Sequence, residues 1–238
     1  MSPYVVGVDG CRSGWLACRL AIAHASYSFA IYGSFERLLA AEREAAVIAI
    51  DIPIGLNDDW TPRACDREAR KLLGRQGSSV FPAPPRSLLK EATYAQALEK
   101  SRACFDRGLS KQIFHIFRKI DEVDSAFRVN RQLPVFEVHP EICFLQLKGD
   151  HLSHSKKTAE GYEERRSLLE QSGVNLPSSD KWRADLGFHA KQVSRDDVPD
   201  AAVAALTARR ASQIEPVFMP AEPTHDACGI RMQLLLMQ

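Results

Sequence analysis

The spacing of apolar and polar residues in the first third of the chain predicts a β-β-β-α-β order. Three strand-like apolar runs come first, and the short links between them favour antiparallel pairing. Helical spacing follows over residues 34–46, with Ser34 placed to cap the helix. The next run is almost wholly apolar, which is typical of a central parallel strand. The predicted strands are residues 4–8, 15–22, 26–32 and 47–56.

The middle of the chain has a mainly helical pattern. Thr61 and Pro62 stand where an N-cap and a first helical residue are expected, and Gly74 stands where that helix should end. An irregular loop over 78–86 and two longer helices, over about 87–107 and 110–127, come next. We interpret residues 60–130 as a helical insertion between two strands of one sheet.

The last third returns to mixed structure. A helix over 196–212 is the strongest signal, with Asp197 able to cap it and Pro199 in its first turn. The chain is expected to form a single α/β domain over residues 1–238. The other predicted elements are a strand at 133–140, a helix at 158–173 and an edge strand at 229–237.

Composition narrows the class of protein without deciding its function. The 238 residues are 45% hydrophobic and carry a formal net charge of +1, so any nucleic-acid surface must be a local patch. None of the six cysteines forms a C-x-x-C pair, which disfavours a structural zinc site. There is neither a signal-peptide pattern nor an apolar run of about 18 residues, so we expect a cytoplasmic protein that does not span a membrane.

Acidic residues stand at the carboxyl ends of two predicted strands: Asp9 follows residues 4–8, and the strand within the apolar run 47–56 is expected to end in Asp51. Asp9 and Asp51 would lie about 5 Å apart if those strands are neighbours, and two anions that close need a cation or a shared proton. Asp200 in the last helix, with Asp197 nearby, and Glu137 on a later strand are further candidates. Such hard oxygen ligands suit Mg²⁺ or Mn²⁺. We predict Asp9, Asp51, Glu137 and Asp200 as catalytic residues, and Asp9, Asp51, Asp197 and Asp200 as metal ligands.

Most of these acids also have a simpler explanation, although Asp51, in an almost wholly apolar run, is harder to explain as solvated surface. Asp9 before Gly10 can be a turn former. Asp197 and Asp200 can be N-terminal helix acids that complement the helix dipole, and Glu137 can pair with an arginine. Four acids in this order therefore carry more weight than any one of them.

Basic residues gather at the start of the helical insertion. Arg63, Arg67 and Arg70 fall at i, i+4 and i+7, so they share a helix face that could bind phosphates. The alternative is a solvated helix in which Asp66 and Glu68 pair locally. Lys156 is a further candidate phosphate contact, and a solvated pair with Lys157 is its alternative.

Several stretches together resemble a known family. The chain is similar to the DUF429 family, described as predicted ribonuclease H-like nucleases, from residue 5 to about residue 232. The resemblance implies a ribonuclease H-like mixed five-stranded sheet, of order 3-2-1-4-5, flanked by helices. It matches Asp9 and Asp51 to the first-strand and fourth-strand acids, and Asp200 or Asp197 to the last-helix acid, an arrangement closer to Holliday junction resolvases. The matching stretches are "VGVDGCRSGW", "IAIDIPIGL", "RACDREARKLLG", "SSVFPAPPR", "FEVHPE", "SKKT" with Gly161 and Arg165 after it, "DDVPDAAVAA" and "DACGIRM".

These observations predict a Mg²⁺- or Mn²⁺-dependent nuclease that hydrolyses phosphodiester bonds of RNA or DNA. Two other classes stay open: a nucleotide-binding phosphotransferase-like protein and a non-catalytic nucleic-acid-binding protein of the same fold. The phosphotransferase fold clamps its nucleotide between two such domains, and this chain has room for one. That alternative would therefore require a homodimer, and the sequence leaves the oligomeric state open.

Overall fold

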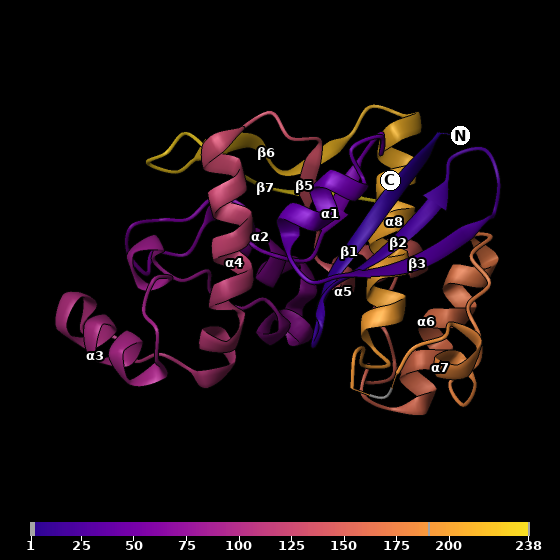
Figure 1. Ribbon diagram of the computed structural model, residues 1–238, viewed down its shortest axis with the longest axis horizontal. Coiled ribbons are helices and arrows are strands. Elements are labelled where there is room, and N and C mark those ends of the chain that lie inside the picture. Colours follow the sequence, from indigo (N-terminus) through magenta and orange to yellow (C-terminus); the bar gives the residue numbers. More distant parts are fainter. Residues whose placement is uncertain (1–2, 190, 238) are drawn as a thin grey trace. The chain divides into compact units, whose positions relative to one another are not determined.

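The computed structural model describes residues 3–189 and 191–237 (Figure 1). These residues form two compact units. Unit 1 contains the described residues of Met1–Ile52, Pro134–Phe218 and Leu234–Gln238. Unit 2 contains Pro53–Leu133 and Met219–Gln233. Among the described residues, no helix has the length and apolar character needed to cross a bilayer. The single-domain organisation remains a prediction.

A mixed seven-stranded sheet has the order β3-β2-β1-β4-β5-β7-β6. The first five positions agree with the predicted order 3-2-1-4-5. The sheet has two strands more than the five that the resemblance implies. One is β6 (Val217–His225), which contains two prolines and gave no strand signal, and the other is β7 (Arg231–Leu236). β7 was expected at the edge but lies between β5 and β6. The remaining strands are β1 (Tyr4–Cys11), β2 (Gly14–Ala21), β3 (Tyr27–Tyr32), β4 (Ile48–Ile50) and β5 (Val135–Glu137).

The β1–β2–β3 meander is antiparallel, whereas β1 pairs with β4, and β4 with β5, in parallel. β4 and β5 are shorter than the runs predicted at 47–56 and 133–140. Pro53 follows β4 closely, and Pro140 begins the helix α5 (Pro140–Lys148), which the sequence analysis missed. Proline has no N–H for the ladder and is favoured in the first turn of a helix, which explains both early strand ends.

One face of the sheet in unit 1 is covered by α8 (Asp197–Gln213), which Figure 1 shows in orange to yellow against β1. Gly7 permits this close packing, because a Cβ built there would lie 2.1 Å from the carbonyl oxygen of Ala201 and 2.0 Å from the amide nitrogen of Ala205. The helix is rich in buried alanines, so its backbone packs directly against the backbone of β1. α5 and α6 (Ala159–Gln171) complete this layer, whose core includes Val5, Leu16, Cys18 and Ala49.

The opposite face of the β1–β3 meander is packed against α1 (Phe35–Ala41). The ring centroids of Trp15 and Phe35 lie 5.7 Å apart. The predicted cap is confirmed, since Ser34 Oγ accepts a hydrogen bond of 3.3 Å from the Arg37 amide. The helix ends earlier than the predicted residue 46.

Unit 2 is largely helical. The predicted end of α2 (Ala64–Leu73) at Gly74 is confirmed, but its predicted start is wrong: Arg63 occupies the N-cap position, beyond Thr61 and Pro62. The next predicted helix starts late, because Thr93 forms a capping box with Gln96. The other helical elements of unit 2 are η1 (Gly74–Ser79), η2 (Arg86–Leu88), α3 (Tyr94–Phe105) and α4 (Lys111–Val129).

A polar network ties distant segments of unit 2 together. The Arg86 guanidinium donates to both carboxylate oxygens of Asp124 at 3.1 Å and also to Asp226. Asp226 in turn accepts from the backbone amides of Leu56 at 3.0 Å and Ile230 at 2.9 Å. The bidentate geometry of the Arg86–Asp124 pair makes these charge-assisted hydrogen bonds strong, and the Arg86 side chain is largely buried.

A carboxylate cluster as candidate active site

Asp9 and Asp51 lie next to each other at the carboxyl ends of neighbouring parallel strands in unit 1. Val8 pairs with Ile50, and each aspartate is the next residue along its strand. The Asp51 amide donates a 3.0 Å hydrogen bond to the Val8 carbonyl, so the register continues to this point. This edge of an open α/β sheet is where ligands commonly bind.

Asp9 points to the face of the sheet that α8 covers. Side chains alternate between the two faces of a strand, so Asp9 shares a face with Gly7, the contact point for Ala201 of α8. Asp200 precedes Ala201 and is 1% exposed. Asp197, one helical turn earlier, is also buried. Strand register and the Gly7 contact thus bring acids from β1, β4 and α8 to one place.

Electrostatics show the same convergence. Burial and the charges of Asp51, Asp200 and Asp197 raise the pKa of Asp9 well above its ordinary value. Burial, with a contribution from Asp200, raises the pKa of Asp51 to about 7. Burial also raises the pKa of Asp197 to about 7, although its Oδ2 accepts a 2.7 Å hydrogen bond from the Ser194 amide. Asp197 is the first residue of α8, not its cap as predicted.

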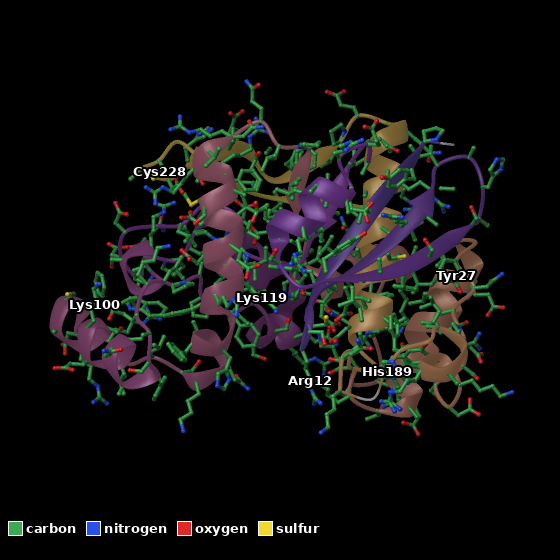
Figure 2. All side chains as sticks on the ribbon, in the orientation of Figure 1. Arg12, Tyr27, Lys100, Lys119, His189 and Cys228 are labelled. Carbon is green, nitrogen blue, oxygen red and sulfur yellow. The ribbon has the colours of Figure 1, made fainter. Side chains whose placement is uncertain are left out.

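Lys156 supplies positive charge to this cluster. Its Nζ lies 2.7 Å from Oδ2 of Asp200. The charges of Asp200, Asp9 and Asp51 together raise the pKa of the lysine, so it stays protonated. Arg12 is exposed in the β1–β2 turn that follows Asp9, and Figure 2 shows it projecting from the sheet. That turn is tied to the segment before α8 by a 3.2 Å bond from the Ser13 amide to the Gln192 carbonyl.

The loop that carries Lys156 is held by the first turns of α6. Glu164 accepts from the backbone amides of Ser153 and His154, each at 2.9 Å. Burial works against this carboxylate, but these amides and the Lys148 ammonium outweigh it and lower the pKa of Glu164 to about 2. Gly161 fits closely beneath the loop, since a Cβ there would lie 1.9 Å from the Ser155 carbonyl oxygen. Lys156 is therefore presented from an anchored segment.

The structure does not bring Glu137 to the aspartates. Glu137 pairs with Ile50, one residue out of phase with Ala49, so its side chain points to the face away from α8. Glu141, in the first turn of α5, contributes instead, and its charge helps to raise the pKa of Asp51. Sequence reasoning missed Glu141 because α5 itself was missed. Arg165, fully buried, donates to Glu141 Oε1 at 2.7 Å and positions it.

The residue types of the cluster fit a hard divalent ion. Oδ1 of Asp200 is buried and has no hydrogen-bond partner among the described residues, which leaves an oxygen lone pair for a cation. Carboxylate oxygens are the ligands that Mg²⁺ and Mn²⁺ prefer. Over residues 3–189 and 191–237, however, no three acidic, histidine or cysteine side chains already surround one ion position. In this arrangement Asp200 is paired with the ammonium group of Lys156.

The predicted basic face of α2 in unit 2 is not formed. Arg63 is 2% exposed; its guanidinium pairs with Asp66 at 2.6 Å and donates to the Ile54 carbonyl at 3.0 Å. Arg70 donates to the Val80 carbonyl at 2.8 Å. Arg67 is exposed, and its Nη1 donates to the Pro62 carbonyl. Of the alternative, a solvated helix with local pairs, the structure contains the pairing of Asp66, but this pair is buried and not solvated.

Fold and site define a mixed α/β protein with an acidic cluster at the carboxyl ends of two central parallel strands. A family model described as "Protein of unknown function (DUF429)" matches residues 7–225. The chain therefore belongs to the DUF429 family, as the resemblance indicated. No curated protein and no solved structure gives a significant match to the chain.

Proposed function

We propose that this protein is a metal-dependent nuclease of the ribonuclease H-like type, which hydrolyses phosphodiester bonds at the carboxylate cluster of unit 1. The observation that carries the proposal is the convergence of Asp9, Asp51 and Asp200 from two strands and α8. A sheet order beginning 3-2-1-4-5, with acids on the first and fourth strands and the last helix, supports the ribonuclease H-like assignment.

In this proposal, Asp9, Asp51 and Asp200 would hold Mg²⁺ or Mn²⁺, with Asp197 beside them. The ion would supply Lewis-acid activation of water and stabilise charge on the phosphate. Lys156 would donate to a phosphate oxygen once its bond to Asp200 is exchanged. A carboxylate beside the ion that is not one of its ligands, such as Asp197 with its raised pKa, would accept the proton of the attacking water. The water oxygen would form a bond to phosphorus as the phosphorus–oxygen bond to the leaving group breaks, and the leaving oxygen would take a proton from solvent water.

The test is cleavage of labelled single-stranded, duplex, hybrid and junction substrates with Mn²⁺. We expect cleavage by the wild type and a loss of at least about 100-fold in Asp9→Asn and in Asp51→Asn, because each removes a charged oxygen ligand. Asp150→Asn, an exposed site in the same unit, is the matched control and should cleave normally. Glu137→Gln should retain more activity than either cluster variant, because its side chain faces away from α8.

Two results would contradict the proposal. Cleavage that persists unchanged in both Asp9→Asn and Asp51→Asn would remove the site. No cleavage of any substrate, together with thermal stabilisation by ATP and Mg²⁺, would favour the nucleotide-binding alternative.

A further inference from the structure

We propose that a cationic pocket beside the carboxylate cluster binds a phosphate group of a nucleic-acid strand, next to the phosphate that is cleaved. The pocket lies wholly within unit 1, and its volume is about 360 Å³. Its charged lining residues are Lys156, Lys157, Arg183, Arg195, Asp180 and Asp196. The inference rests on the proposed nuclease function for the identity of the strand.

The charge of the pocket favours an anion. Four cationic side chains and two carboxylates line the pocket. Lys156 is paired with Asp200 and Lys157 with Asp196, so Arg183 and Arg195 together exceed Asp180 by one positive charge. Guanidinium groups present planar pairs of N–H donors that match phosphate oxygens. The volume is at the lower end of the range for small-molecule sites, so one phosphate and its sugar suit it better than a large ligand.

The cations are held in place by neighbouring groups. Lys157 Nζ lies 2.5 Å from Oδ2 of Asp196, and Arg195 donates to the Lys157 carbonyl at 2.9 Å. The Arg183 guanidinium lies over the ring of Trp182 with its carbon 4.8 Å from the ring centroid. Trp182 belongs to the short helix α7 (Trp182–Asp185) and is itself buried, so its ring restricts the position of the Arg183 side chain. These contacts leave N–H groups of the exposed Arg183 and the largely exposed Lys157 to a ligand.

Lys156 connects the pocket to the carboxylates. It lines the pocket and at the same time lies 2.7 Å from Asp200. A strand with one phosphate in the pocket would therefore reach the carboxylate cluster through Lys156. This continuity distinguishes the pocket from the exposed cations of α2, which belong to unit 2.

The binding test uses the full chain in EDTA, so that no cleavage occurs. Fluorescence anisotropy measures the affinity for a labelled single-stranded oligonucleotide at 50 to 200 mM salt, with a mononucleotide and inorganic phosphate as competitors. We expect Arg183→Ala and Lys157→Ala each to weaken binding roughly 5- to 10-fold and to lower the salt slope by about 0.7 per lost contact. Arg37→Ala and Arg43→Ala, exposed cations of the same unit, are the matched controls.

Asp196→Asn separates a binding role from a structural one. It removes the carboxylate that pairs with Lys157, so the lysine becomes available and oligonucleotide binding should tighten several-fold. If the pair were only structural, both Lys157→Ala and Asp196→Asn would lower the thermal midpoint and neither would tighten binding.

Each outcome decides between the claims. Affinity unchanged in Arg183→Ala and Lys157→Ala overturns the pocket, even if Mn²⁺-dependent cleavage by the wild type supports the nuclease. Pocket-dependent binding without cleavage of any substrate retains the pocket and removes the nuclease. A mononucleotide that competes as well as the unlabelled oligonucleotide, per molecule, overturns the assignment to a strand.

Discussion

Lys156 and Asp200 form an ion pair with an Nζ–Oδ2 distance of 2.7 Å, and the charge of this lysine also acts on the half-buried Asp9 and Asp51. Oδ1 of the same Asp200 has no hydrogen-bond partner among the described residues. Over the described part of the chain, Lys156 is thus a cation shared by at least three carboxylates. Without a metal ion, the charge of these carboxylates is balanced by Lys156 and by the protons that they retain. The folding stability of the protein should therefore change when Lys156 is replaced and when the pH is raised.

Removing the lysine should destabilise the protein more at pH 8 than at pH 5. Lys156→Met leaves Asp200 buried without its partner, which costs on the order of 3 kcal/mol when the neighbouring acids are ionised. At pH 5, Asp51 and Asp197 retain protons because their pKa values are about 7, so the loss should be smaller. Urea unfolding in EDTA at both pH values measures the difference. Lys71→Met, at an exposed position of α2, should show little change at either pH.

The wild type should lose stability as the pH rises through 7. Folding raises the pKa of Asp51 from 3.8 to about 7, so its favourable contribution is fully present below about pH 4 and is lost as the pH rises through 7. The loss amounts to at most about 4 kcal/mol. Asp51→Asn has no charge to bury and should be more stable than the wild type at pH 8 in EDTA. Equal pH dependence of unfolding in the two proteins would show that Asp51 is not held in such an environment.

Gly7→Ala should be strongly destabilising. The new Cβ would lie 2.0 Å from the Ala205 amide nitrogen and 2.1 Å from the Ala201 carbonyl oxygen, both backbone atoms of α8 that cannot rotate away. Overpacking typically costs about 1–3 kcal/mol, and we expect a value at the upper end of this range because backbone atoms of α8 would have to move. Gly33→Ala is the matched control, because a Cβ there has no atom within 4 Å. Chemical denaturation measures both variants, and a Gly7→Ala midpoint equal to that of Gly33→Ala would mean that α8 does not pack as described.

Substitutions of Arg63 and Arg67 should have clearly different effects on stability, although the two residues lie one helical turn apart. Arg63→Met breaks a buried pair with Asp66 and the bond to the Ile54 carbonyl, which should cost about 3–5 kcal/mol of folding free energy. Arg67→Met alters an exposed side chain and should cost less than about 0.5 kcal/mol. Circular dichroism during thermal unfolding gives the comparison. Similar midpoints for the two variants would mean that Arg63 is not held in this buried pair. Arg63 and Arg67 could then share the predicted phosphate-binding face.

The sequence predicted correctly those features of the fold and site that depend on a few adjacent residues. Asp9 and Asp51 stand directly after buried apolar runs, so their neighbouring positions followed from the strand pattern and the β-β-β-α-β order. Gly74 and Ser34 were recognised because a helix end and a helix cap each depend on a few adjacent residues.

The errors arose where tertiary packing decides. Glu137 was assigned to the site from its strand, but a strand alternates its faces, and pairing with Ile50 turns Glu137 away from α8. Glu141 was missed because Pro140 was read as the end of a strand and not as the start of α5. The burial of Arg63 could not be foreseen from helical spacing, because its partner at Ile54 is a backbone carbonyl.

The most direct test of the central claim is the anomalous diffraction map of a crystal soaked in Mn²⁺. The proposal predicts a peak about 2.1 Å from carboxylate oxygens of Asp9, Asp51 or Asp200, with Lys156 moved away from Oδ2 of Asp200. A map with no peak at these three residues, and with the Lys156–Asp200 pair intact at saturating Mn²⁺, would contradict it.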